Sequence, residues 1–177
     1  MPELSSGESG IRVGLAHVSL VNNETGEAMD FMINPADLRE VLSVKWSVPS
    51  PIMRAPGGPL QYEGTEPKEF TIRAAADREL FPDRDIMDWR SFLDSLCYPI
   101  RSGDTIADPP TVLFVWPGLL AMPVKIVGLS NAFDDFGRDL HPKSFVSEIT
   151  MREYGDTIRW SDEERTRITI TEGLVVE

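Results

Sequence analysis

Apolar and polar residues alternate along several stretches of the chain, a pattern typical of β-strands with one buried face. The clearest stretch is 42–48, and residues 70–76, 122–126 and 145–151 repeat the pattern. Residues 112–116 are apolar throughout, which predicts a central strand or one that is covered on both sides. The residues expected to face a core are Leu42, Val44, Trp46, Val48, Phe70, Ile72, Ala74, Ala76, Met122, Val124, Ile126, Phe145, Ile149 and Met151.

A hairpin is expected near the start of the chain. Residues 11–21 are apolar and β-prone, and residues 22–26 form a turn-like Asn-Asn-Glu-Thr-Gly segment. The alternating Met29, Phe31 and Ile33 then predict the second strand of the hairpin.

One amphipathic helix is predicted over about 84–97. Asp83 follows Pro82 and is expected to be the N-cap, and Pro99 ends the segment. A doubly wound α/β fold needs a helix between most of its strands, so a single helix favours an antiparallel, mainly β domain of the α+β class. Apolar residues follow at helical spacing: Ile86, Trp89, Leu93 and Leu96.

The segment 49–67 is expected to be a long loop, because it holds five prolines and three glycines. Its apolar residues need burial, which favours an arm that reaches across to another subunit over a poorly ordered loop. Trp160 stands in a polar tail, where an aromatic side chain favours an interface anchor. The candidate subunit or layer interface therefore consists of Ile52, Met53, Leu60, Gln61, Tyr62 and Trp160.

Composition and charge disfavour several classes of protein, among them nucleic-acid-binding, disulfide-stabilised and membrane-spanning proteins. The 177 residues suffice for one domain with a core, and a net charge of −12 disfavours binding to nucleic acid. A single cysteine rules out an intrachain disulfide. Residues 109–124 form the longest uncharged stretch, which is short for a membrane span and broken by prolines.

We divide the chain into a flexible N-terminus (1–10), one β domain (11–154) and an acidic C-terminal tail (155–177). The first ten residues have neither a basic region nor an apolar region, so we expect no secretory signal and synthesis in the cytoplasm.

No arrangement of residues points to a specific catalytic chemistry. Cys97 and His141 are the residue types of a nucleophile and its base. However, Cys97 is expected in the core and His141 in an exposed turn. Asp134 and Asp135 are expected in a turn that precedes residue 145, and Asp83 and Asp85 near a helix cap. We therefore expect no enzymatic activity, no cofactor and no metal. Trp46, Trp89 and Trp116 are expected to pack in the core.

Four motifs occur in a fixed order: F-x-I-N-P at 31–35, V-x-W-S at 44–47, P-P-x-V-L-F-x-W at 109–116 and F-x-x-x-G at 133–137. In this order they resemble the tube-type N-terminal domain of contractile injection systems, which are phage-tail-like devices. The resemblance covers about 11–154 and is strongest to the baseplate protein that often carries a LysM module. The chain has Lys143-Ser144 where relatives have Arg-Ala, and too few residues follow Tyr154 for a LysM module.

The resemblance implies a structural protein and no enzyme. It implies an antiparallel β-barrel or sandwich that forms a ring, expected to be a homo-hexamer, between the spike hub and the inner tube. There it would initiate tube assembly within a phage-tail-like particle. The implied partners are further copies of the chain, the inner tube protein, the spike or hub protein and other baseplate proteins. Edge strands that pair with the next copy would close such a ring.

Two alternatives remain open at the level of the sequence. A monomeric β-barrel could bind a small ligand in its mouth, and its oligomeric state would separate it from a ring-forming subunit. A hydrolase that uses paired carboxylates ranks last, because no pair of carboxylates has a defined geometry.

Overall fold

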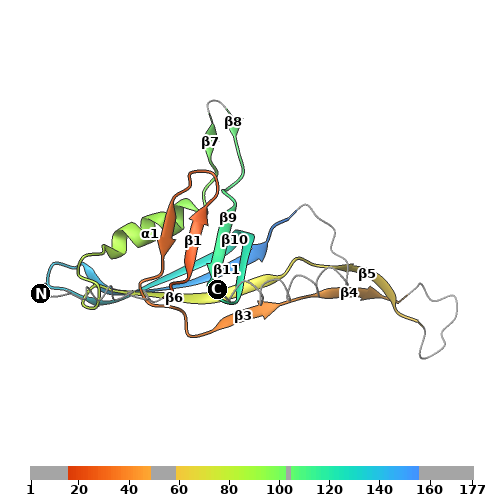
Figure 1. Ribbon diagram of the computed structural model, residues 1–177, viewed down its shortest axis with the longest axis horizontal. Coiled ribbons are helices and arrows are strands. Elements are labelled where there is room, and N and C mark those ends of the chain that lie inside the picture. The colour runs from red at the N-terminus through yellow and green to blue at the C-terminus, as the bar shows by residue number, and fades with distance from the viewer. Residues whose placement is uncertain (1–15, 49–58, 103–104, 156–177) are drawn as a thin grey trace, which may run out of the picture.

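Seven strands form one antiparallel sheet that curves around a single helix (Figure 1). The computed structural model describes residues 16–48, 59–102 and 105–155. The strand order in this sheet is β2-β1-β9-β10-β11-β6-β3, and two-stranded ribbons β4–β5 and β7–β8 project from it. The elements are β1 (Ser19–Asn22), β2 (Ala28–Asp30), β3 (Leu38–Val41), β4 (Val44–Ser47), β5 (Gln61–Thr65), β6 (Glu69–Asp77), α1 (Ile86–Ser95), β7 (Arg101–Ser102), β8 (Thr105–Ile106), β9 (Val112–Trp116), β10 (Leu120–Phe136) and β11 (Pro142–Glu153). The predicted antiparallel, mainly β fold with one helix is confirmed.

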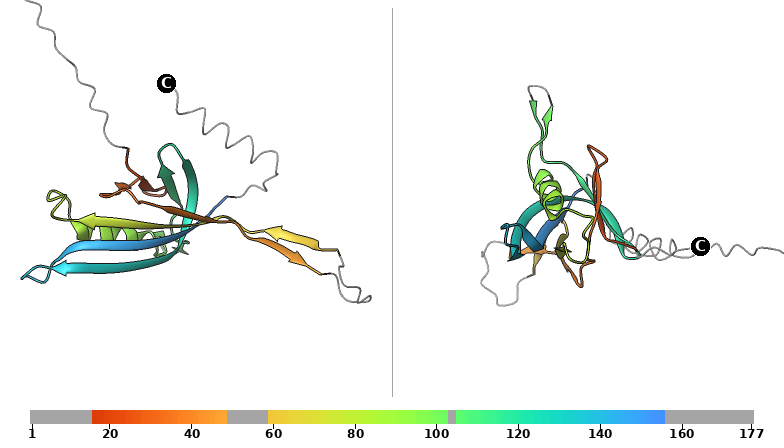
Figure 2. Two further views of the ribbon diagram at one scale, coloured as in Figure 1. Left: turned by 90° about the horizontal axis from the view of Figure 1, so that it is seen from below. Right: turned by 90° about the vertical axis from the view of Figure 1, so that its left-hand side faces the viewer.

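The sheet curls far enough for its two edges to approach each other. The segment after β2 crosses to the far side of the sheet, where Ile33 forms an isolated antiparallel bridge with Ala75 of β6. The right-hand view of Figure 2 shows the sheet curving around α1. The helix thus occupies the concave side of the sheet, and the core lies between them.

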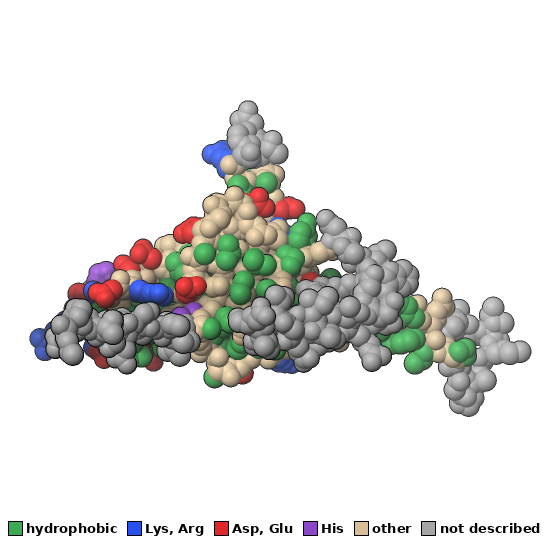
Figure 3. Space-filling model, viewed as in Figure 1, with side chains coloured by type: hydrophobic (Ala, Val, Ile, Leu, Met, Phe, Trp, Pro, Cys, Tyr) green, Lys and Arg blue, Asp and Glu red, His purple; other side chains and the backbone are tan. Residues whose placement is uncertain are grey.

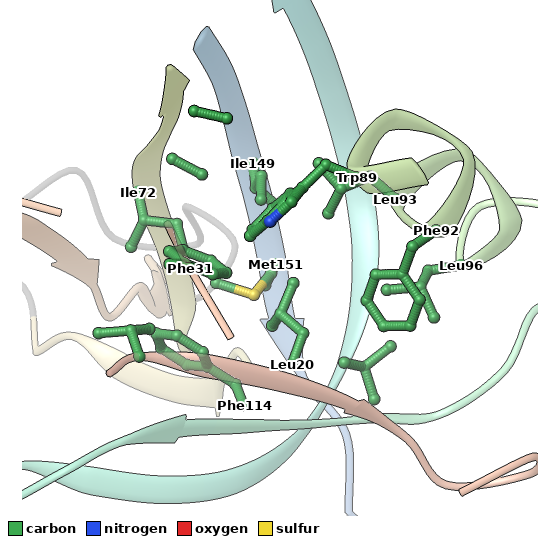
Figure 4. Packing of buried hydrophobic residues seen from close by; sticks show 14 of the residues in the cluster. Leu20, Phe31, Ile72, Trp89, Phe92, Leu93, Leu96, Phe114, Ile149 and Met151 are labelled. Atoms are coloured by element: carbon green, nitrogen blue, oxygen red, sulfur yellow. The ribbon is translucent and has the colours of Figure 1, made fainter. Parts of the chain in front are cut away.

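The core joins the inner face of the sheet to the buried side of α1 (Figure 4). Phe31 and Trp89 meet edge to face, with ring centroids 4.9 Å apart. Trp89 is 3% exposed, which confirms its predicted place in the core. The predicted inward faces of residues 70–76 and 145–151 are also confirmed, since these side chains are buried: Phe70, Ile72, Ala74, Ala76, Phe145, Ile149 and Met151.

The helix is shorter than predicted, and its cap lies two residues later. Asp85, not Asp83, is the N-cap: its backbone is extended and its carboxylate accepts a hydrogen bond of 2.9 Å from the backbone N–H of Met87. The chain before Asp85 turns instead, since the N–H of Arg84 donates to the carbonyl of Phe81. No helix in the described ranges is long and apolar enough to span a bilayer.

One expected turn and one expected strand differ from the structure. Asp134 and Asp135 belong to β10, because the ladder continues through Asp134↔Ser144 and Phe136↔Pro142. The turn therefore occupies residues 137–141. The second strand of the first hairpin is confirmed as β2, but it ends at Asp30 and the following two side chains, Phe31 and Met32, are both buried.

Candidate interaction surface

The β4–β5 ribbon projects from the sheet as an arm, defined here as residues 42–48 and 59–66 (Figure 1). It continues the β3–β6 pair, since β4 follows β3 directly and β5 leads into β6. At the junction the N–H of Glu66 donates to the carbonyl of Ser43 over 2.9 Å. The arm is therefore a long two-stranded extension of one side of the sheet.

One face of the arm is apolar and exposed to solvent. Trp46 lies opposite Tyr62 in the ladder, and their rings meet edge to face with centroids 5.5 Å apart. Trp46 is 54% exposed and Tyr62 is 56% exposed. Alternation along each strand continues this face in both directions. We define the apolar face of the arm as Leu42, Val44, Trp46, Val48, Leu60 and Tyr62, all of which are exposed.

The other face of the arm is polar. Lys45 forms an ion pair with Glu66, and the ladder shifts register between Lys45 and Trp46. The hydrogen bond and charge of Glu66 raise the pKa of Lys45, and Lys45 in turn lowers the pKa of Glu66. Both side chains are exposed, so this pair sets the polarity of the face without contributing much stability.

The alternation in residues 42–48 is thus confirmed, but the predicted burial of that face is wrong. Trp46 does not join the core with Trp89. A period of two shows that apolar side chains share one side of a strand, and it does not show what covers that side.

The structure places the predicted interface residues in three ways. Leu60 and Tyr62 lie on the apolar face of the arm, and Gln61, between them, pairs with Ser47 and lies on the opposite side by strand alternation. Ile52, Met53 and Trp160 lie outside the described residues. The segment 49–67, expected to be a loop, contains β5. The structure adds Leu42, Val44, Trp46 and Val48, whose signal in the sequence was the alternation that was assigned to the core.

The β10–β11 turn lies at the opposite end of the molecule from the arm (Figure 2), and a second group of exposed apolar side chains lies there. We define this end as the tip: residues 78–81, which follow β6, and residues 136–141 of the β10–β11 turn. Its exposed apolar residues are Leu80, Phe136 and Leu140. Lys143 bridges the two sides of the tip at the surface, since its Nζ lies 3.2 Å from an oxygen of Glu79 and 3.7 Å from an oxygen of Asp135, the residue before the second segment.

Leu140 has an unusual backbone conformation. Its φ is 60°, in the left-handed region that disfavours residues with a Cβ, and its side chain is 80% exposed. Hydrogen bonds fix the turn, from the N–H of Gly137 to the carbonyl of His141 and from the N–H of Leu140 to the carbonyl of Gly137. The turn therefore presents a large apolar side chain at a position where the fold itself gains nothing from it.

The candidate catalytic residues do not form a site. Cys97 is half-buried after the end of α1, where its Sγ lies 3.5 Å from the carbonyl oxygen of Leu93. Burial, with a contribution from the charge of Asp94, raises the pKa of the Cys97 thiol. A nucleophilic cysteine needs the opposite shift. His141 is exposed in the tip, as predicted.

The acidic residues near the start of α1 line a shallow pocket of about 320 Å³. Asp83, Asp85 and Asp88 border it together with Arg84 and Trp89. Asp85 is already engaged as the helix cap. Within the described ranges, no group of three or more His, Cys, Asp or Glu side chains is arranged to hold a metal ion.

No protein-family model matches the sequence, and no curated protein matches it. Among solved structures, a chain from the tail of an empty GTA particle, determined by helical refinement with C6 symmetry, is 14% identical, with a TM-score of 0.40, over 81% of this chain and 96% of that chain. A chain from the virion of a native gene transfer agent (GTA) particle is 14% identical, with a TM-score of 0.38, over 78% of this chain and 92% of that chain.

Proposed function

We propose that this protein is a non-catalytic structural subunit of a phage-tail-like contractile injection particle. In this proposal it forms a ring, a hexamer by the sequence resemblance, that joins the spike hub to the inner tube and initiates assembly of the tube. Its partners are further copies of itself, the inner tube protein, the spike or hub protein and other baseplate proteins. It is made in the cytoplasm and works within the assembled particle.

The apolar face of the arm is the observation that carries the proposal. A two-stranded ribbon is marginally stable in water without packing against something else. This ribbon exposes six large apolar side chains on one face while the opposite face is polar. Contiguous exposed apolar surface of this kind is typical of a protein interface. The kind of assembly is inferred from the order of the four sequence motifs, which resembles that of contractile injection systems.

The interior of the fold supports a structural role over ligand binding. A ligand-binding barrel keeps an open cavity at its mouth. Here the concave side of the sheet is filled by α1 and by buried aromatic rings, among them Phe31, Trp89 and Phe114 (Figure 4). The described surface pocket lies at the edge of this core, where charged side chains such as Asp83, Arg84 and Asp88 line it together with Trp89.

The test is assembly with defined partners. The purified protein is examined by native mass spectrometry and negative-stain microscopy, alone and mixed with the inner tube and spike proteins of the same particle. We expect six-fold rings or a stable complex with the tube or spike protein. A variant with Trp46→Ser and Tyr62→Ser removes the centre of the apolar face, and it should lose these complexes while remaining folded. A protein that stays monomeric and binds neither the tube protein nor the spike protein would contradict the proposal.

A further inference from the structure

We infer that the arm of one copy packs on the tip of a second copy, so that copies associate head to tail. This inference deepens the proposed function and rests on it, because it names which surface receives the arm. The arm and the tip lie at opposite ends of the long axis of the molecule (Figures 1 and 2). They therefore cannot cover each other within one chain, whereas two copies in line bring them together.

The arm supplies the larger apolar surface. Its apolar face holds six exposed side chains, and the space-filling view shows green side chains at this narrow end of the molecule (Figure 3). The Trp46 and Tyr62 rings, which meet edge to face, form its centre. Stacked aromatic side chains at the centre of an exposed patch are typical anchors of interfaces.

The tip supplies a smaller apolar surface. Leu80, Phe136 and Leu140 project from the two sides of the tip, which Lys143 bridges at the surface through Glu79 and Asp135. Leu140 holds a left-handed backbone although its side chain touches solvent and not the core. Burial of this leucine by a partner would offset the cost of its left-handed backbone.

The charges at the two ends favour the unlike pairing. Glu63 on the arm and Arg138 at the tip form no ion pair within the part of the chain that the structure describes. The charged residues of the arm, Lys45, Glu63 and Glu66, leave it with an excess negative charge, whereas Arg78, Glu79, Arg138 and Asp139 of the tip balance one another. Packing an arm on a tip therefore avoids the repulsion between two Glu63 carboxylates that packing two arms together would bring. Contact between unlike surfaces leaves one arm and one tip free on every pair of copies, so the association repeats until it closes into a ring or continues as a filament.

The experiment uses two variants of the full chain. The arm variant carries Trp46→Glu and Tyr62→Glu, and the tip variant carries Phe136→Asp and Leu140→Asp. All four positions are exposed, and aspartate tolerates the left-handed backbone at 140, so both variants should fold. A control variant carries Leu119→Asp and Val127→Asp, which are exposed apolar positions outside the arm and the tip. Circular dichroism confirms folding, and analytical ultracentrifugation measures assembly over a range of concentrations.

We expect the wild-type protein and the control variant to assemble beyond the dimer. Each of the two end variants alone should remain monomeric. An equal mixture of the two should form a dimer and stop there, because only one intact arm and one intact tip are present in each pair.

Three outcomes would overturn the inference. A tip variant that assembles like the wild type would place the receiving surface elsewhere, as arm-to-arm packing requires. A mixture that stays monomeric would show that the two ends do not meet. A wild-type protein that stays monomeric at every concentration would indicate that the arm is covered by residues 156–177 of its own chain or by another protein. In that last case, incorporation into a complex with the tube or spike protein would still support the proposed function, so the two failures are distinguishable.

Discussion

Trp46 and Tyr62 lie directly opposite each other across the arm, with their ring planes inclined at 68°. The two rings contact each other, and each leaves more than half of its surface in solvent. In most small domains such a pair would pack on a core. Here it stands outside the core, on a surface that is distinct from the packing that holds the domain together.

Replacing Trp46 with serine should leave the domain stable and remove its association. An edge-to-face aromatic pair contributes about 0.5–1.5 kcal/mol beyond its buried area, and less where both rings are exposed, so the loss of unfolding free energy should stay below about 1 kcal/mol. Thermal unfolding and sedimentation measure the two effects. A large fall in the melting temperature would indicate that Trp46 packs on the core.

Replacing Trp89 with alanine should destabilise the fold by about 3–5 kcal/mol, because the substitution leaves a large cavity between α1 and the sheet. Trp89→Phe is the matched control. The indole Nε1 of Trp89 is buried and has no hydrogen-bond partner among the described residues, so phenylalanine loses volume without losing a hydrogen bond. Denaturant titration should show a much smaller loss for phenylalanine than for alanine. Equal losses would contradict this account.

Removing the arm should leave the body of the protein folded. Val41 of β3 and Glu69 of β6 are paired, so replacing residues 43–66 by Asn-Gly joins these strands through a five-residue hairpin loop. We expect a cooperative unfolding transition and no assembly. Loss of cooperative unfolding would show that the body depends on the arm, and normal assembly would exclude the arm from the interface.

Cys97 should react slowly with alkylating reagents at neutral pH. Burial raises the pKa of its thiol, which lowers the fraction of thiolate below that of a free cysteine at the same pH. The rate of reaction with iodoacetamide should rise as the pH rises toward that raised pKa, and denaturant should remove the difference from a model thiol. Fast alkylation of the folded protein at pH 7 would indicate an activated cysteine and reopen the catalytic interpretation.

Gly118 should be intolerant of a side chain. It has a φ of 76° in the short turn between β9 and β10. An added Cβ meets no atom there, so the cost is one of backbone conformation and should reach about 1 kcal/mol. Gly64 also has open space around it and lacks a positive φ, so Gly64→Ala is the control and should change the melting temperature little. Equal effects of the two substitutions would contradict the assignment.

The sequence predicts the core of this protein well, because periodicity and burial agree there. The face of residues 70–76 and the apolar side of α1 both pack as expected, since each lies within reach of the other. The exact start of the helix depends on which of two nearby aspartates caps it. That choice is decided by a local turn at Arg84, which the apolar spacing does not encode.

The candidate interface is only partly predictable, for a physical reason. Residues 42–48 and residues 70–76 have the same alternation, yet one face is exposed and the other is buried. The difference lies in what stands opposite each strand, and that depends on the tertiary fold and on partners. Leu60 and Tyr62 were singled out because they are apolar within a Pro- and Gly-rich segment, whereas Trp46 carried no such signal.

The number of strands in the main sheet gives any lateral array of this protein a direction. Six antiparallel steps separate β2 from β3, so the two outermost strands point the same way. When identical sheets stand side by side with all strands keeping their orientation, β3 of one copy meets β2 of the next as a parallel pair, with the slanted hydrogen bonds of that arrangement. Such an array has two chemically different rims, and a component that is added to one rim finds a surface that the other rim does not offer.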